Sequence, residues 1–261
     1  MRRLLSILLL AVSAITAFST AQFTERIRDN GVCRGLATCL LELDSASFSR
    51  LEERIPDGLS STALWRNYIG CWKIQNDSLF LDSVLVSGHA ADKPRYVPVR
   101  LDDIYAARRT PSGYFADWVT DTLRIVSGDY VRYEHLGWCS SWEHEEFVSV
   151  KGGIVKGRTV YENRVVNPVS QGARRQVVDS LDLGHVPGKI ILDVRCEDFD
   201  SLGKPTAYKV KVARGCGDSA VDCRVARVIE SPEVLSRILP IYYIRGRYQA
   251  DRWLLPITAR P

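Results

Sequence analysis

The last third of the chain carries the feature that most restricts its fold. Two stretches of apolar–polar alternation are followed there by one amphipathic repeat. A period of two residues is typical of half-buried strands, whereas apolar residues at i, i+4, i+7 and i+8 are typical of one helix face. The alternating stretches are 190–194 and 208–212, the repeat is 221–229, and a last apolar stretch is 253–257. We therefore expect residues 189–261 to form a small α+β domain in the order ββαβ.

Local signals support these boundaries. Gly203–Lys204–Pro205 is a turn between the two alternating stretches. Asp218 or Ser219 can cap the helix that follows, and Pro232 lies just past its end, where a helix can no longer continue.

The middle of the chain consists of short apolar segments separated by turn residues. Asn76–Asp77 is a favourable hairpin turn between strands expected at 68–74 and 79–84. Residues 22–61 have a mixed pattern, with one short helix expected at 48–55. We expect 22–166 to form a mostly β domain, an antiparallel meander that is barrel-like or a sandwich. Gly and Pro interruptions then predict a linker over 167–188.

The first residues have the composition of a secretory signal peptide. Arg2 and Arg3 precede an apolar run, and small residues at Ser19 and Ala21 suit cleavage before Gln22. The apolar run, 4–18, is shorter than the roughly 20 residues that span a bilayer. An uncleaved anchor is the alternative. We expect residues 1–21 to be removed, leaving an exported protein of a Gram-negative periplasm without a stable membrane span.

The charge of the chain bears on nucleic-acid binding, and its cysteine content bears on disulfides and metal sites. The formal net charge of +4 and the scattered basic residues give no indication of nucleic-acid binding. The seven cysteines of an exported chain favour disulfides, with at least one cysteine left unpaired, and the dispersed histidines disfavour a zinc site. The disulfide candidates are Cys33 with Cys39, Cys71 with Cys139, and Cys196, Cys216 and Cys223 near the helix.

No arrangement of residues predicts a defined reaction. Glu134–His135 and His144–Glu145 place acids beside imidazoles, but neighbours on a strand point to opposite faces. There is no Gly-x-Ser-x-Gly motif, phosphate loop or dinucleotide fingerprint. The sequence therefore predicts no catalytic residue, metal site or cofactor, and an enzyme is disfavoured.

The C-terminal part resembles the C-terminal domain of TonB-type energy transducers. The residues that carry the likeness are 210–217, 221–229, the turn Arg245–Gly246–Arg247 and Leu255–Pro256–Ile257. The Trp-x-Pro segment that usually follows the family's helix is absent, as is its long Pro/Lys-rich spacer. Segments 63–74 and 115–124 are similar only to parts of uncharacterised secreted or immunity-like bacterial proteins.

The resemblance implies a binding module of the cell envelope, and the missing spacer together with the expected loss of residues 1–21 argues against an anchored energy transducer. Its partner would be a protein or peptide whose extended segment adds a strand at the last strand. The binding residues would be Arg252, Trp253, Leu254 and Leu255. A second copy of the chain, forming a homodimer, is another such partner. Two further alternatives are a secreted hydrolase or glycan-binding enzyme using the tryptophan-rich β-domain, and a structural or immunity-type interaction protein.

Overall fold

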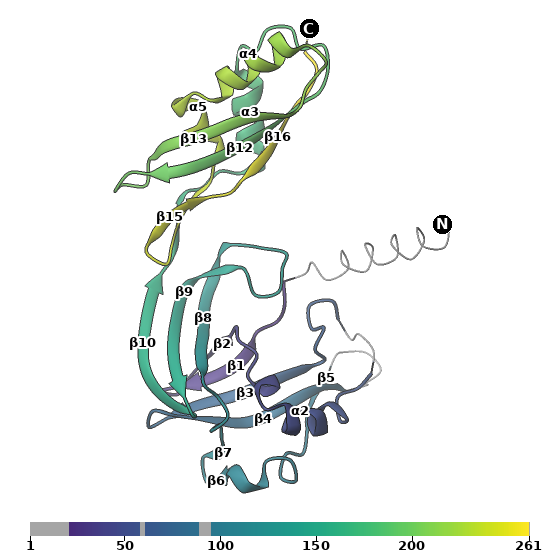
Figure 1. The fold of residues 1–261 in the computed structure, drawn as a ribbon, viewed down its shortest axis with the longest axis vertical. Coiled ribbons are helices and arrows are strands. Elements are labelled where there is room, and N and C mark those ends of the chain that lie inside the picture. The colour runs from purple at the N-terminus through teal and green to yellow at the C-terminus, as the bar shows by residue number, and fades with distance from the viewer. Residues whose placement is uncertain (1–20, 58–60, 89–94, 261) are drawn as a thin grey trace, which may run out of the picture. The chain divides into compact units, whose positions relative to one another are not determined.

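The structure is a computed structural model that describes residues 21–57, 61–88 and 95–260 (Figure 1). The expected signal peptide therefore lies outside the described residues, except for Ala21. The protein is mostly β, as the sequence predicts. The chain divides into two compact units, Met1–Glu162 and Asn163–Pro261. Within the described ranges, no helix has the length and apolar character needed to cross a bilayer.

One ten-stranded sheet forms the first unit, in the order β10-β9-β8-β2-β1-β3-β4-β7-β6, with β5 paired to β4. A further pair, Ile154 with Ser78, joins β10 to β4, so that the ladder closes into a ring. The strands are β1 (Glu25–Asp29), β2 (Val32–Leu36), β3 (Tyr68–Gln75), β4 (Ser78–Gly88), β5 (Arg95–Pro98), β6 (Arg109–Thr110), β7 (Gly113–Phe115), β8 (Asp121–Arg132), β9 (Ser141–Lys151) and β10 (Ile154–Glu162).

The pairing of β1 with β3 is parallel, which differs from the antiparallel meander expected from the sequence. The β1–β2 hairpin lies between β3 and β8, two strands that come later in the chain. The expected turn at Asn76–Asp77 is confirmed. Both residues have positive φ, 50° and 55°, which a two-residue hairpin turn between twisted strands requires.

Three short helical segments accompany the sheet: η1 (Leu41–Leu43), α2 (Ser45–Glu52) and η2 (Ala106–Arg108). Helix α2 begins three residues before the expected helix at 48–55. Its N-cap is Asp44, whose carboxylate accepts a hydrogen bond from the amide of Ser47 at 3.3 Å.

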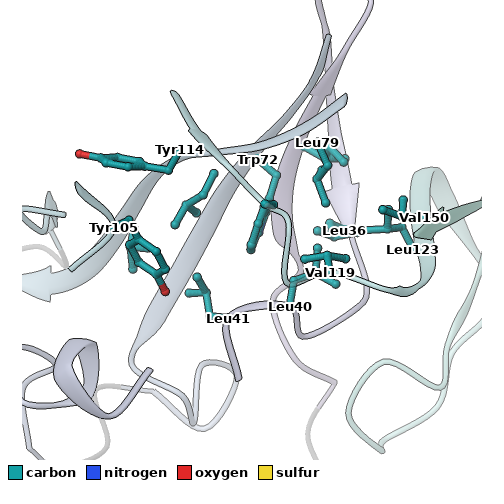
Figure 2. Close-up of a cluster of buried hydrophobic side chains, with 14 of the residues drawn as sticks. Leu36, Leu40, Leu41, Trp72, Leu79, Tyr105, Tyr114, Val119, Leu123 and Val150 are labelled. Atoms are coloured by element: carbon teal, nitrogen blue, oxygen red, sulfur yellow. The ribbon is translucent and has the colours of Figure 1, made fainter. Parts of the chain in front are cut away.

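The main core of the first unit combines side chains of these strands, such as Trp72 and Leu123, with side chains of the segments between them, such as Leu40 and Val119 (Figure 2). Trp72 is almost fully buried, and the ring of Tyr105 stacks on that of Trp118 with centroids 5.1 Å apart. Aromatic rings thus belong to this core, and each buries a large area. Trp65 is an exception, because its side chain is exposed.

Two small sheets and three helices form the second unit. One sheet has the order β13-β12-β16 and the other the order β11-β14-β15. The elements are β11 (Arg164–Asn167), α3 (Gln171–Ser180), β12 (Ile190–Phe199), β13 (Pro205–Arg214), α4 (Ser219–Ile229), α5 (Pro232–Ile238), β14 (Ile241–Ile244), β15 (Arg247–Ala250) and β16 (Trp253–Ile257).

All three helices pack on one face of the β13-β12-β16 sheet. Ile190, Leu192 and Val194 of β12 point to that face and are fully buried. Residues of α4 and α5 contribute the helix side of this core. Asp218 caps α4, because its carboxylate accepts hydrogen bonds from the amides of Ala220 and Val221. The opposite face of the sheet carries no helix among the described residues.

Two segments differ from the sequence-based expectations. The expected linker 167–188 contains helix α3, capped by Ser170, whose Val177 and Val178 belong to the core of the second unit. The order ββαβ is interrupted, because α5 and the β14–β15 hairpin lie between α4 and β16 in the chain. The helical pattern of 232–238 is too short to show a period on its own.

Candidate functional site

Strand β16 contains three of the four residues expected to bind a partner, and Arg252 immediately precedes it. Among the described strands, β16 pairs with β12 alone, so it forms one edge of the β13-β12-β16 sheet. Its register places Trp253 opposite Val194, Leu254 opposite Asp193 and Leu255 opposite Leu192. An edge strand presents backbone N–H and C=O groups that a further strand can use.

Pro256 fixes which backbone groups of β16 point outward. It lies opposite Ile191 and has no N–H, so this cannot be a pair that exchanges two hydrogen bonds. Hydrogen-bonded and non-bonded pairs alternate along an antiparallel ladder. The pair of Leu254 with Asp193 is therefore also non-bonded, and the N–H and C=O of Leu254 point away from β12.

Side chains of β16 alternate between the two faces of the sheet. Leu255 and Ile257 point to the helices and are buried, at 3% and 0% exposure. Leu254 points to the opposite face and is 52% exposed, a large apolar side chain in solvent. The expected binding residues thus lie at one edge but on two different faces.

Three charged residues surround Leu254 on the helix-free face. Arg252 Nε lies 2.8 Å from Asp193 Oδ1, and Arg195 Nη2 lies 2.8 Å from Asp193 Oδ2. Hydrogen bonds from Arg195, and next from Arg252, hold the pKa of Asp193 well below its usual range. One carboxylate is therefore paired with two guanidinium groups, so this group of three residues has a net positive charge.

A groove of about 540 Å³ lies between β16 and helix α3. Its apolar lining includes Val178, Trp253 and Leu255. The guanidinium of Arg174 lies over the Trp253 ring, with its Cζ 4.6 Å from the centroid. Such a cation–π contact holds the helix beside the strand. We call this feature the edge groove; its full lining is Gln171, Arg174, Arg175, Val178, Asp179, Trp253, Leu254, Leu255, Pro256, Thr258 and Arg260.

Arg260 holds the C-terminal end of α3 in place. Its guanidinium donates to the carbonyl oxygens of Val178, at 2.9 Å, and Leu181, at 3.1 Å, and pairs with Asp179 at 3.3 Å. The last carbonyls of a helix have no partners within the helix, so these bonds satisfy them and suit the negative helix end. Helix α3, which forms one wall of the edge groove, is therefore held in two places: by the contact of Arg174 with Trp253 and by the bonds from Arg260.

The first unit contains a buried ionic group that sequence analysis did not identify. Glu25 is fully buried; its carboxylate accepts a hydrogen bond from Trp72 Nε1 at 2.6 Å and lies 3.3 Å from Arg66 Nη1. Burial raises the pKa of Glu25 to about 7, although the charge of Arg66 and the bond from Trp72 lower it. Arg66 also stacks on Trp138, 4.3 Å from its centroid.

A pocket in the first unit, with a volume of about 540 Å³ like that of the edge groove, lies beside the tight turns that follow β1 and β3. One of the cations that line it, Arg158, is already paired with Asp29 and Glu146, at 2.5 Å and 2.8 Å. Burial alone would raise the pKa of Glu146, but hydrogen bonds from Arg158 and Arg34 lower it. These contacts neutralise the cation inside the pocket and make it part of a structural network.

All seven cysteines are free thiols in the structure, so the expected bridges are not formed. In the ladders, Cys33 lies opposite Arg28, Cys71 opposite Arg26 and Ser83, and Cys196 opposite Tyr208. No strand cysteine thus has another as its cross-strand neighbour. Burial raises the pKa of the Cys39 thiol to about 11, although Arg66 lowers it, which makes this thiol a poor nucleophile.

In the acid–imidazole neighbours His144–Glu145, the two side chains contact different partners. His144 contacts Glu162 across the β9–β10 ladder at 2.5 Å on the exposed surface, whereas its neighbour Glu145 is buried. Glu145 instead pairs with Arg124. Among the described residues, no group of three or more His, Cys, Asp or Glu side chains is placed to hold a metal ion.

Helix α3 is the part of the candidate site that sequence analysis missed. Ser170 is a good N-cap residue and was a usable signal, but Val177 and Val178 are adjacent and show no helical period. Comparison with known proteins adds no family or relative: no family model, no curated protein and no solved structure matches the chain.

Proposed function

We propose that the second unit binds an extended peptide segment of a protein partner in the cell envelope, by addition of a strand to β16. The observation that carries the proposal is the outward direction of the Leu254 N–H and C=O at an edge strand, next to a groove that can receive side chains. Main-chain hydrogen bonds supply affinity in this mode of recognition, and pockets for alternate side chains supply specificity.

The shape of the site supports strand addition over capture of a small molecule. The lining of the edge groove follows the chain from Trp253 of β16 to Thr258, just past the end of the strand. A peptide paired with β16 would place every second side chain in this groove and the others beside Leu254. The resemblance of 210–217 and 221–229 to TonB-type domains supports the same mode of binding, as does the expected export of the chain.

Substitution of Leu254 by proline tests the proposal. Because its N–H points away from β12, Leu254→Pro removes a donor for the partner and no bond within the sheet. Pro256, two residues on, already occupies an equivalent position. Leu254→Ala is the matched control, since it removes the same side chain and keeps the N–H.

The experiment is selection of a displayed library of random octapeptides on the full chain. We expect selected peptides to bind the wild type and Leu254→Ala, and to lose at least about tenfold in affinity for Leu254→Pro, the loss expected for unsatisfied main-chain groups. Circular dichroism of both variants checks that the fold is kept. The proposal is wrong if no peptide is enriched, or if enriched peptides bind the folded proline variant as well as they bind Leu254→Ala.

A further inference from the structure

We propose that the segment which binds β16 is acidic, with apolar residues at alternate positions for the edge groove. This inference rests on the strand addition proposed above and specifies the chemistry of the partner. It follows from the charges at the edge groove, the charges on the helix-free face, and the apolar lining between them.

Positive charge is in excess along the edge groove. The lining includes Arg174, Arg175 and Arg260 but only one carboxylate, that of Asp179. Asp179 is shared between Arg260, at 3.3 Å, and Arg175, at 3.6 Å. The side chain of Arg175 is 85% exposed, so its guanidinium is available to a ligand at little cost in desolvation.

Arg174 has hydrogen-bonding capacity that the described residues do not use. Its Nε is buried and has no hydrogen-bond partner, and its Nη2 makes one long bond, 3.4 Å, to the carbonyl of Val169. Guanidinium groups bind carboxylates through two parallel N–H donors. A carboxylate at the groove can therefore bind the Nη groups of Arg174, whose bond to Val169 is long.

The helix-free face next to Leu254 is also positive. Arg195 and Arg252 share Asp193, and the ladder places Lys211 opposite Asp193 and Lys209 opposite Arg195. Lys209 has Glu197 at 4.0 Å, whereas Lys211 is exposed. Residues of an added strand that point to this face would lie nearest Arg252, whereas Lys209 and Lys211, on β13 at the opposite edge of the sheet, add only to the overall positive charge of the face.

Apolar contacts lie between these charges. Trp253, Leu255 and Val178 line the groove, and Trp253 is only partly buried. Side chains two positions apart on a strand point the same way and lie roughly 7 Å apart. Two apolar residues at alternate positions can therefore contact this lining while acidic residues before and after them reach Arg174 and Arg175.

The same charges oppose pairing of two copies of the chain through β16. A second copy would bring a second set of arginines to the shared edge, and like charges on adjacent strands are destabilising. Pro256 of each copy would also lack a donor at the new ladder. The charge pattern therefore favours an acidic partner over the homodimer.

Two isosteric peptides test the inference on the full chain. Both are octapeptides with blocked ends and valine at the third and fifth positions. At all remaining positions one peptide has glutamate and the other has glutamine. We expect the glutamate peptide to bind at least about tenfold more tightly at low salt, with an advantage that shrinks as salt is added. Arg175→Gln and Arg252→Gln should each weaken its binding roughly two- to fivefold and weaken binding of the glutamine peptide less.

Two controls separate the possible results. Arg227→Gln, on the exposed side of α4, should change neither affinity. Leu254→Pro should weaken binding of both peptides at least about tenfold. If both peptides bind the wild type equally and both are weakened to this extent in Leu254→Pro, the acidic preference is wrong and strand addition stands. If the glutamate peptide binds Leu254→Pro as tightly as wild type, strand addition itself is wrong.

Discussion

The guanidinium of Arg174 lies over the indole of Trp253, with 4.6 Å between its Cζ and the ring centroid. This contact joins helix α3 to the edge strand β16 within the second unit. It also forms part of the surface that a bound peptide would cover. The remaining five tryptophans, Trp65, Trp72, Trp118, Trp138 and Trp142, all belong to the first unit.

Trp253 should therefore report binding at the edge groove. We expect its fluorescence emission to move to shorter wavelength when the glutamate peptide is added, because the peptide removes water from a partly exposed indole. Trp253→Phe should keep most of the affinity and lose the spectral change. An unchanged wild-type spectrum at saturating peptide, or the same change in Trp253→Phe, would place the bound peptide elsewhere.

Gly70 should not tolerate a side chain. A Cβ there would lie 2.5 Å from Glu25 Oε2 and 2.7 Å from Trp72 Nε1, in the fully packed interior of the first unit. We expect Gly70→Ala to lower the free energy of unfolding by about 1–3 kcal/mol, measured by urea denaturation with tryptophan fluorescence. Gly157→Ala on β10 is the control, since a Cβ there meets nothing within 4 Å, and should change stability by less than about 1 kcal/mol.

Glu25 should make stability depend on pH in a defined direction. Its pKa is about 7 in the folded protein and near the ordinary 4.5 when unfolded. Between these values the folded state holds a proton that the unfolded state has released, so the free energy of unfolding falls as pH rises from about 4.5 to about 7. Above pH 7 the contribution of this group is constant.

Glu25→Gln should remove that part of the pH dependence. Glutamine can still accept the hydrogen bond from Trp72 but does not titrate. Urea unfolding of both proteins at intervals from pH 4.5 to pH 8 gives the difference directly. Parallel stability curves for the two proteins would show that Glu25 does not titrate in this range.

A local sequence pattern was sufficient to predict several elements of the fold. The two alternating stretches predicted β12 and β13, the repeat at 221–229 predicted α4, and Asn76–Asp77 predicted the β3–β4 turn. In each case the period or turn chemistry is contained within about ten residues. The β1–β2 hairpin carries a signal of the same kind at Asn30–Gly31, within a region that otherwise has a mixed pattern.

Other features depend on contacts between residues far apart in the chain. The parallel pairing of β1 with β3 and the closure of β10 on β4 by Ile154 and Ser78 leave no local pattern. Glu25 and Trp72 come together through the parallel pairing of β1 with β3, and Arg66 joins them from the segment before β3. The edge groove likewise requires α3 to pack beside β16, so its arginines were not among the predicted binding residues.

Hydrogen exchange at the Leu254 amide is the most direct test of strand addition. The measurement compares backbone amides of the full chain, free and saturated with the glutamate peptide. The account predicts that exchange of the Leu254 amide slows by more than about tenfold on binding, whereas that of Leu255, already bonded to β12, changes little. Exchange at Leu254 that is unchanged at saturation would contradict it, because the partner would then be bound without using this edge.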